Sequence, residues 1–534
     1  MSFRFRIRFV VLAMALCAMA TASARPRLVV NIVVGGLRQS DLTRYEKNFG
    51  KGGFLRLRSN GVEFLECYAD YAPTSPEAGL ATFATGTIPA VHGIFSSAYF
   101  DRTSNKKLEL CYNPQVKSGG MTQKGIETAR TMQPFIAATL SESVLNSSEQ
   151  NKVITIAHNP LSAMILTGRK GDCFWMNRDG MWVSADCYMK ELPAWVHSYN
   201  DSAINRTFAT EVWYSHYPRE RYRNIRATDI VVSDRSDAKR TRQGEKVIDG
   251  WVNDMNYMPS GNVAILEFAK RALASMLPLH INDDCKMLNI CLDVSRNVVE
   301  KYGPDSMEYE DMLYSLDASL AEFLTYLYAQ HSKHEDIVVV LTSDGGVSPT
   351  QKENTDVARF NVRQFEIIMN AFLSARYGQD LWVLGYADGS LYLNHSVIYN
   401  HKKTIEEVQN EAAIFALQYR GVATAIAATA MRSAQFSKGF LSLVQNGYNP
   451  RRSGDVMMTF DVERIELDAN RVAMSGSVYS YDRHIPFIVS CTGLYPKRVT
   501  DRISSDQMAP SLATLIGVER PLCSDAETLV IGSR

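Results

Sequence analysis

Four short apolar runs separated by stretches of helical periodicity dominate the hydrophobic pattern of the chain. The runs carry no charge, which is typical of strands buried on both faces of a parallel sheet. They are Leu28–Val34, Val153–Ala157, Met287–Leu292 and Ile337–Leu341. Helical patterns fall between them, for example at Pro76–Thr85, Phe135–Leu145, Val263–Ser275 and Met307–Tyr328. This alternation predicts an α/β fold with a largely parallel central sheet covered by helices on both faces.

Two segments interrupt this pattern. Residues 166–257 hold five of the six tryptophans and a charged stretch from Arg219 to Lys246, which we interpret as a solvated loop in an inserted subdomain. Residues 385–450 mix Tyr-rich strand patterns with an Ala-rich helix, Glu406–Tyr419. We therefore predict one domain over residues 25–534 with a Trp-rich insertion and a smaller second insertion.

The last apolar run ends in a polar turn. Thr342-Ser343-Asp344-Gly345-Gly346 follows Ile337–Leu341 directly. Open α/β sheets place their ligand sites at the carboxyl ends of such strands. The turn is therefore a candidate part of a functional site.

The first 24 residues read as a signal peptide. Arg4, Arg6 and Arg8 precede an apolar stretch from Phe9 to Ala20, and Ala22-Ser23-Ala24 supplies small residues for cleavage. The apolar stretch is too short for a stable membrane anchor, and no later segment reaches 18 apolar residues. We predict an exported protein without a transmembrane segment, most simply periplasmic, with outer-membrane association or secretion as alternatives.

The amino-acid composition excludes several classes of protein but does not identify the function. The 534 residues are 46% hydrophobic with 57 basic and 57 acidic side chains, which excludes disordered and fibrous chains. The absence of a basic surplus argues against nucleic-acid binding. Loss of the three arginines of the signal peptide leaves the mature chain acidic.

Eight of the nine cysteines lie outside the signal peptide. They are Cys67, Cys111, Cys173, Cys187, Cys285, Cys291, Cys491 and Cys523. An oxidising compartment permits disulfides, and Cys173 and Cys187 flank a hairpin-like pattern that would bring them together. The alternative is that several are buried free thiols. None has zinc-finger spacing.

Motifs spread over nearly the whole mature chain resemble the alkaline phosphatase superfamily, and most of all the phosphate-irrepressible alkaline phosphatases of Gram-negative bacteria. The early motifs are Leu28–Val34, Gly52-Gly-Phe54, Tyr71-Ala-Pro-Thr74 and Thr85–Gly93. The later ones are Gly261-Asn262, Glu310-Asp311, Thr342-Ser-Asp344, Tyr448–Gly454 and Tyr479–Pro486. The resemblance implies a two-zinc phosphomonoesterase, in which six Asp and His side chains hold the ions and a Thr or Ser is the nucleophile.

Most positions that match those functional residues hold other residue types here. The nucleophile position holds Pro76, and the positions of metal ligands hold Gly35, Arg296, Glu300 and Gly345. Asp344 and His484 match the two remaining ligands. The positions of the phosphate-binding Asn, Lys and Arg fall on or near Ser97, His158 and Pro160.

These replacements are chemically incompatible with the implied zinc site. Glycine has no donor atom, and a guanidinium stays protonated. Its charge against a zinc ion would cost about twice the 4 kcal/mol expected for two unit charges 4 Å apart at an effective dielectric constant of 20. We expect no bound zinc, no other cofactor and no catalytic residue.

Some alternatives stay open at this point. Ser75 and Thr74 are alternative nucleophiles, but Ser75-Pro76-Glu77 has the pattern of an N-cap, an N1 proline and a first-turn acid. Asp293 and Glu300 could bind metal only if the loop shifted register and removed Arg296. Asp344 and His484 are remnants or hydrogen-bond partners of loops.

Three functions follow from these expectations. The chain is a pseudoenzyme, an exported phosphatase-like protein that binds without hydrolysing. Alternatively, it is an active two-zinc phosphatase or phosphodiesterase with a rearranged site. A third hypothesis makes it a subunit of a cell-envelope complex that contacts its protein partner through the tryptophans of residues 166–257, unless these form the core of that segment. The oligomeric state cannot be predicted.

Overall fold

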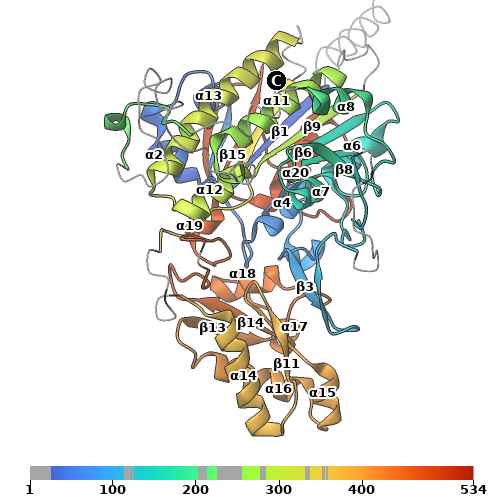
Figure 1. Ribbon diagram of the computed structural model, residues 1–534, viewed down its shortest axis with the longest axis vertical. Helices are drawn as coiled ribbons and strands as arrows, with labels where there is room; N and C mark the ends of the chain where they lie inside the picture. Colours follow the sequence, from blue (N-terminus) through green and yellow to red (C-terminus); the bar gives the residue numbers. More distant parts are fainter. Residues whose placement is uncertain are drawn as a thin grey trace, which may run out of the picture.

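The fold is described here from a computed structural model. It describes residues 26–113, 122, 125–202, 213–224, 255–276, 284–330, 337–351, 355, 359–468, 470–492 and 494–532. The predicted signal peptide, residues 1–24, lies outside this part, as do Trp251 and most of the charged stretch from Arg219 to Lys246. Figure 1 shows a large α/β body with a smaller lobe below it.

A ten-stranded mixed sheet forms the large body, in the order β16-β2-β15-β10-β1-β9-β6-β7-β8-β5. Its middle is parallel: β10 pairs with β1, β1 with β9, β9 with β6 and β6 with β7. These strands are β10 (Ile337–Ser343), β1 (Leu28–Val34), β9 (Lys286–Leu292), β6 (Lys152–Ala157) and β7 (Asp172–Met176). The flanking strands are β15 (His484–Cys491), β2 (Gly61–Tyr68), β16 (Lys497–Ser504), β8 (Trp182–Ala185) and β5 (Ile126–Glu127). The predicted parallel sheet is confirmed.

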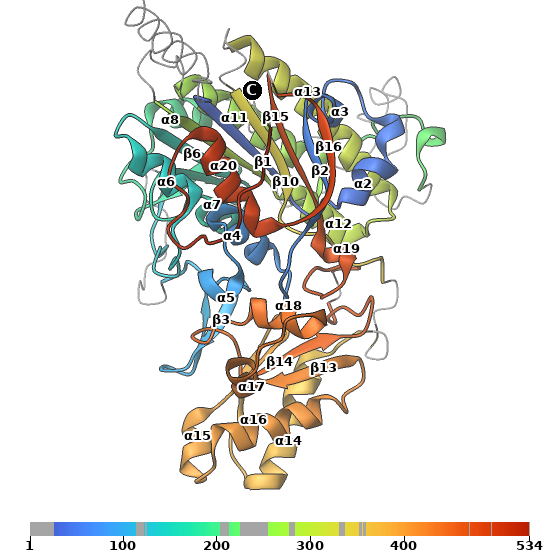
Figure 2. The same ribbon diagram turned by 180° about the vertical axis from the view of Figure 1, so that it is seen from behind.

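Helices cover both faces of this sheet, as predicted (Figures 1 and 2). One face packs against α2 (Gln39–Arg44), α3 (Phe54–Ser59), α8 (Ala194–Asp201), α11 (Pro259–Met276), α12 (Val294–Tyr302) and α13 (Met307–Gln330). The other packs against α4 (Pro76–Thr85), α6 (Leu140–Ser147), α7 (Pro160–Thr167) and α20 (Met508–Ile516). Alternate residues of the strands enter the two cores, since successive side chains of a strand point to opposite faces.

The predicted strands and most predicted helices agree with the structure to within a few residues. Pro76–Thr85 matches α4 at both ends, whereas the helix predicted at Phe135–Leu145 begins only at Leu140. Thr139 is its N-cap and accepts a hydrogen bond from the backbone N–H of Glu142 at 3.2 Å. This polar cap fixes the first turn, so the apolar residues before it lie in a loop.

The described part of residues 166–257 contributes to the central sheet instead of folding apart from it. Strands β7 and β8 form the predicted hairpin at its edge, and Trp175 and Trp182 are buried in the two cores of the large body. Trp182 stacks on Phe268 of α11 with ring centroids 4.0 Å apart. Trp195 packs against the same ring, and Trp213 donates to Asp311 at 2.6 Å. These tryptophans are therefore core residues and not anchors for a partner.

The smaller lobe contains the predicted second insertion and extends beyond it. A four-stranded sheet in the order β11-β12-β14-β13 packs against helices and has its own core, which includes the fully buried Trp382. The strands are β11 (Val383–Ala387), β12 (Ser390–Leu393), β13 (Val422–Ala427) and β14 (Val456–Phe460). The helices are α14 (Val362–Tyr377), α15 (His395–Asn400), α16 (Ile405–Ala416), α17 (Ala428–Ser433) and α18 (Gly439–Gly447). We call this lobe the cap.

The remaining short elements connect the two lobes. The ribbon of β3 (Ala98–Asp101) and β4 (Lys106–Glu109) leans on the cap, where the rings of Phe100 and Tyr392 lie 4.9 Å apart. Helix α5 (Pro89–His92) contacts α18, and α19 (Ser480–Arg483) leads into β15. Short 3-10 turns lie at Glu46–Asn48, Arg219–Arg221 and Ser505–Gln507. The contacts of the β3–β4 ribbon and of α5 thus join the cap to the body.

All eight predicted mature cysteines are described, and all are free thiols. The disulfide predicted between Cys173 and Cys187 is therefore absent, although the hairpin between them exists. In that hairpin Trp175 pairs with Val183, so continuing the register places Cys173 opposite Ala185 and not opposite Cys187. The alternative of buried free thiols describes most of this set.

In the described part of the chain, no helix has the length and apolar character needed to cross a membrane.

Candidate functional site

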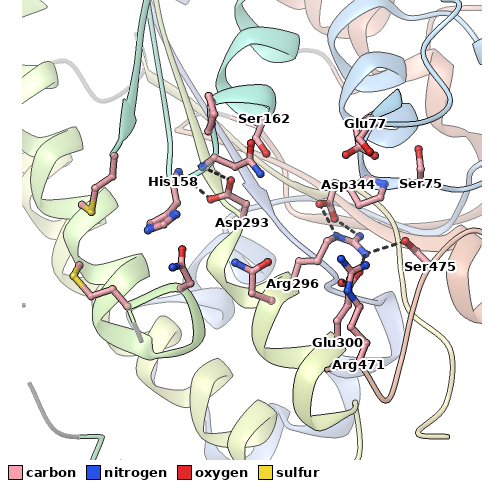
Figure 3. Close-up of a pocket in the computed structure, with 18 of the residues that line it drawn as sticks. Ser75, Glu77, His158, Ser162, Asp293, Arg296, Glu300, Asp344, Arg471 and Ser475 are labelled. Carbon is pink, nitrogen blue, oxygen red and sulfur yellow. Dashed lines mark hydrogen bonds and ion pairs between the residues drawn. The ribbon is translucent and has the colours of Figure 1, made fainter. Parts of the chain in front are cut away.

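The carboxyl ends of the middle strands open into a cavity of about 460 Å³. Asp344 follows β10, Asp293 follows β9 and His158 follows β6, and all three line the cavity. The N-terminus of α4, with Ser75 and Glu77, lies beside Asp344, whereas Asp293 and His158 lie at the other end of the cavity (Figure 3). Asp388 of the cap also lines the cavity. The polar turn after β10, which the sequence marks as a candidate, is thus part of the cavity wall.

Arg296 is the central charge of this cavity. It lies in the first turn of α12 and is 5% exposed. Its Nε and Nη2 atoms donate to the two carboxylate oxygens of Asp344 at 2.9 and 2.6 Å. Its Nη1 atom donates to Glu300 at 3.4 Å and to the hydroxyl of Ser475 at 3.2 Å (Figure 3).

The partners of Arg296 keep it charged. Burial opposes the charge, but Asp344 and then Glu300 outweigh it, so the pKa of Arg296 is raised above its ordinary value. Asp344 also accepts the backbone N–H of Gly36 at 2.8 Å. A bidentate arginine–carboxylate pair with this backbone support is a fixed structure, because every strong donor has an acceptor.

Glycines at two positions border Arg296, the first for lack of space and the second for its backbone conformation. A Cβ atom at Gly35 would lie 2.9 Å from the Cβ of Arg296, closer than side chains approach. A Cβ at Gly345 would lie 3.5 Å from its Nη2, and the φ of +136° disfavours any side chain there. Three positions predicted for metal ligands thus hold residues that fit one another, namely the two glycines and the arginine that they border.

The residues present do not fit a pair of zinc ions. The described residues hold no group of three or more His, Cys, Asp or Glu side chains arranged to bind a metal. Asp344 and Glu300 instead share the guanidinium of Arg296, and Arg471 approaches Glu300 from the other side at 3.4 Å. An ion at this place would have to displace a tethered cation.

The first turn of α4 has the predicted capping structure. Ser75 is the N-cap and its hydroxyl accepts the N–H of Ala78 at 3.1 Å, while Pro76 occupies N1. The hydroxyl of Thr74 donates to the carbonyl of Ser477 at 3.0 Å. Ser75 and Pro76 line the cavity, but Pro76 has no reactive atom and the oxygen of Ser75 is engaged in the cap.

Glu77 follows in the same turn, and its surroundings disfavour the charged form of its carboxyl group. Burial, together with the nearby carboxylate of Asp388, raises the pKa of Glu77 to about 7. Asp388 belongs to the cap, in the turn between β11 and β12. Two carboxylates from different lobes thus face the same cavity.

Asp293 and His158 form the opposite wall. The two oxygens of Asp293 accept the backbone N–H groups of His158 and Asn159 at 3.0 and 2.8 Å. Burial raises the pKa of Asp293, and burial lowers the pKa of His158. Asp293 therefore fixes the strand-to-helix turn before α7 and lies apart from the Arg296 network (Figure 3).

The structure does not place His484 at the site. Its Nε2 atom lies 2.7 Å from the carbonyl oxygen of Leu65, and its ring stacks on Tyr68 at 4.5 Å. His484 does not line the cavity, because it is the first residue of β15 and pairs with Tyr68 of β2. Of the two roles left open for His484, remnant ligand or hydrogen-bond partner, this contact with Leu65 favours the second.

The positions predicted for phosphate binding do reach the cavity. Ser97, His158 and Pro160 all line it, together with Asn159 and Asn297. None of the three replaces the cationic side chain or amide implied by the resemblance, and Pro160 is simply the N1 residue of α7. The wall is therefore polar but lacks the expected anion clamps.

Sequence reasoning missed four residues of the site in their present role. Ser475 and Arg471 lie on the segment that returns from the cap, and Asp388 lies in a turn of the cap itself. Glu77 was recognised only as a first-turn acid. A signal existed for Ser475, which lies just before the Tyr479–Pro486 motif, but no local pattern points to Arg471 or Asp388.

Comparison with known proteins finds relatives that match over nearly the whole chain. The chain is 24% identical over 520 residues to alkaline phosphatase PafA of Elizabethkingia meningoseptica, covering 94% of this chain and 93% of the relative. It is 25% identical over 529 residues to alkaline phosphatase PhoV of Synechococcus elongatus, with 93% and 91% covered. A Myroides odoratus protein named calcium-transporting ATPase is 25% identical over 515 residues, with 93% of each chain covered.

Solved structures show the same fold. The crystal structure of alkaline phosphatase PafA matches with a TM-score of 0.84 at 22% identity, over 96% of this chain and 100% of that one. Murine ectonucleotide pyrophosphatase / phosphodiesterase 5 matches with a TM-score of 0.51 at 12% identity, over 93% and 96%. Residues 29–463 match the family of type I phosphodiesterases and nucleotide pyrophosphatases. The predicted membership in the alkaline phosphatase superfamily is thereby confirmed, and the chain belongs to the type I phosphodiesterase / nucleotide pyrophosphatase family.

Proposed function

We propose that this chain is a catalytically inactive member of its family, which keeps the fold and the cavity for binding. The observation that carries the proposal is the guanidinium of Arg296, held between Asp344 and Glu300 where the resemblance implies metal ions. A fixed cation there excludes zinc, and without zinc no group in the cavity can activate a nucleophile for phosphoryl transfer in the way the family does.

The other replacements point the same way. Pro76 stands at the nucleophile position, and Gly35 and Gly345 border Arg296. The loss of a single group would suggest altered chemistry. The combined loss of nucleophile, metal ligands and phosphate clamps favours the loss of catalysis itself.

We further propose an exported location and a role in the cell envelope. The support is residues 1–24, with their three arginines, apolar stretch and small cleavage residues. A protein partner is part of this proposal and a nucleic acid is not, given the acidic mature chain. Periplasmic residence is favoured over outer-membrane association and secretion.

The competing function is an active zinc-dependent phosphatase or phosphodiesterase with a rearranged site. It is supported by the names of the relatives PafA and PhoV, both called alkaline phosphatases. Ser75 is its best nucleophile, because Ser75 lines the cavity and Thr74 does not. The hydroxyl of Ser75 would have to leave its cap to react.

One assay separates the two functions. Purified mature protein is tested for hydrolysis of p-nitrophenyl phosphate and bis-p-nitrophenyl phosphate, with and without added zinc, and its metal content is measured. We expect rates equal to the buffer blank and less than one zinc per chain. Turnover that disappears in Ser75→Ala or Asp344→Asn protein would overturn the proposal.

A further inference from the structure

The charges on the cavity wall favour a cation. Five carboxylates line it, at Glu77, Asp293, Glu300, Asp344 and Asp388, against three arginines, at Arg178, Arg296 and Arg471. Two of these arginines are already engaged: Arg296 with Asp344 and Glu300, and Arg471 with Glu300 and Asp468. A phosphate ester would meet a net negative wall here, whereas a cation would be attracted.

The uncompensated charge is concentrated on one side of the cavity. Neither Glu77 of α4 nor Asp388 of the cap forms an ion pair with any described residue. The charged groups that act on Glu77 are Asp388, Arg296 and Asp344, and those that act on Asp388 are Lys107 and Arg471. None of these cations forms an ion pair with either carboxylate, and the hydrogen-bond partner of Asp388 is the neutral side chain of Ser96. The two acids thus line the same cavity, from different lobes, without a counter-ion among the described residues.

A buried carboxylate oxygen without a donor lies beside them. A side chamber of about 40 Å³ shares Asp388, Met474 and Ser475 with the main cavity. Its charged lining residues are Asp388, Glu466, Asp482 and one cation, Arg464. Asp482 is fully buried; its Oδ2 atom accepts the N–H of Ser477 at 2.7 Å, but its Oδ1 atom accepts no hydrogen bond from the described residues. Such an atom needs a donor that the chain does not supply.

We propose that the cavity binds an organic cation with a primary ammonium or guanidinium group, whose charged end lies between Glu77 and Asp388. The inference rests on the proposed binding function and names its ligand class. An ammonium group carries several N–H donors and no acceptor, which suits acceptors that converge from Glu77, Asp388 and the side chamber. A bare metal ion fits less well, because the described residues offer no group of three ligating side chains.

The proton competes with this ligand. Glu77 binds a cation only when ionised, and its pKa is raised to about 7 by burial and by Asp388. A carboxyl with this pKa passes from about nine-tenths ionised at pH 8 to about one-tenth at pH 6, so affinity falls about tenfold over that interval. Glu466, whose pKa is also raised to about 7 by burial and Asp388, titrates in the same range.

The test is calorimetric titration of the mature protein with cadaverine and agmatine at pH 8. We expect both to bind and 1,5-pentanediol, inorganic phosphate and calcium not to bind. Glu77→Gln and Asp388→Asn should each weaken cadaverine at least tenfold and remove most of the pH dependence. Asp305→Asn is the matched control, since this surface carboxylate pairs with Arg44 far from the cavity.

Three results would overturn the proposal: no heat with either amine, full affinity in both cavity variants, or binding of phosphate or calcium in place of the amines. Melting temperatures equal to wild type establish that the variants are folded, and where one of the two cavity variants is not folded, the other carries the test. Phosphatase turnover is measured on the same samples. Turnover together with amine binding would reject only the proposed loss of catalysis, whereas turnover without amine binding would reject both proposals.

Discussion

Two parts of the cavity wall differ in how their charges are paired. In one part, Arg296 joins Asp344, Glu300 and Ser475 in a network in which each buried charge has a partner. In the other part, the half-buried carboxylates of Glu77 and Asp388 have no ion-pair partner among the described residues. A satisfied network is part of the fold, whereas half-buried carboxylates without a counter-ion mark the place where a ligand is to be sought.

The largest effect is expected when Arg296, the cation of the paired network, is removed. Arg296→Met leaves Asp344 buried without its partner and leaves Glu300 with Arg471 alone, which should lower the free energy of unfolding by about 3–5 kcal/mol. Urea denaturation at pH 8 measures the loss. Arg376→Met is the control, because Arg376 pairs with Glu411 at the surface and should contribute less than about 1 kcal/mol. Equal effects in the two variants would show that Arg296 is not the structural cation.

Reversing the charge at the same position sharpens the contrast. Arg296→Asp places a third carboxylate beside Asp344 and Glu300, so zinc gains ligands that the natural chain lacks. We expect zinc to stabilise this variant by about 2.7 kcal/mol at a hundredfold excess over its Kd, and to leave the natural protein unchanged. Thermal melts with zinc and with EDTA measure both. Stabilisation of the natural chain by zinc would contradict the structural role of Arg296.

The carboxyl group of Glu77, which has no ion-pair partner among the described residues, should affect how the free energy of unfolding depends on pH. A carboxyl whose pKa is raised to about 7 by folding binds protons more tightly in the folded state, so it supports the fold below about pH 4.5 and loses that support as pH rises through 7. Glu77→Gln should therefore flatten the decline between pH 5 and 8, and stabilise the protein at pH 8 by on the order of 1–2 kcal/mol. Glu406→Gln is the control, because Glu406 is exposed in the first turn of α16 and its removal should leave the pH dependence of the free energy of unfolding unchanged. An unchanged slope would mean that Glu77 is not held in a charge-disfavouring site.

The smallest expected effect concerns Ser75. Ser75→Ala removes the cap of α4 and should cost about 1 kcal/mol, like Asn361→Ala at the start of α14. Both losses are read from chemical denaturation. Binding of cadaverine should be unchanged, because the hydroxyl faces its own helix. An effect of Ser75→Ala on binding much larger than on stability would place this hydroxyl on the functional side of the cavity.

Much of the fold could be predicted because its strands are continuous apolar runs. Leu28–Val34 and Pro76–Thr85 coincide with β1 and α4, where local pattern and tertiary structure agree. The Trp-rich segment misled because composition does not show which sheet a strand joins. Strand β7 pairs with β6, and this long-range register turned an apparent insertion into part of the core.

The sequence predicts which residue types stand at the site but does not predict the contacts that they make. Glycine at 35 and 345 and arginine at 296 are visible in the chain, and their incompatibility with zinc follows from their chemistry. That Arg296 would pair with Asp344, 48 residues away, depends on how α12 crosses the end of β10. The approach of Asp388 to Glu77 depends on where the cap docks, which no local pattern records.

Arg296 has a consequence for how this part of the cavity forms. A metal-binding site is complete only after its ions have been acquired from solution. Here the positive charge is part of the polypeptide, and its pairing with Asp344 is complete once α12 packs against β10. The charge balance around Asp344 therefore needs no further step after folding, and a chelator cannot remove it.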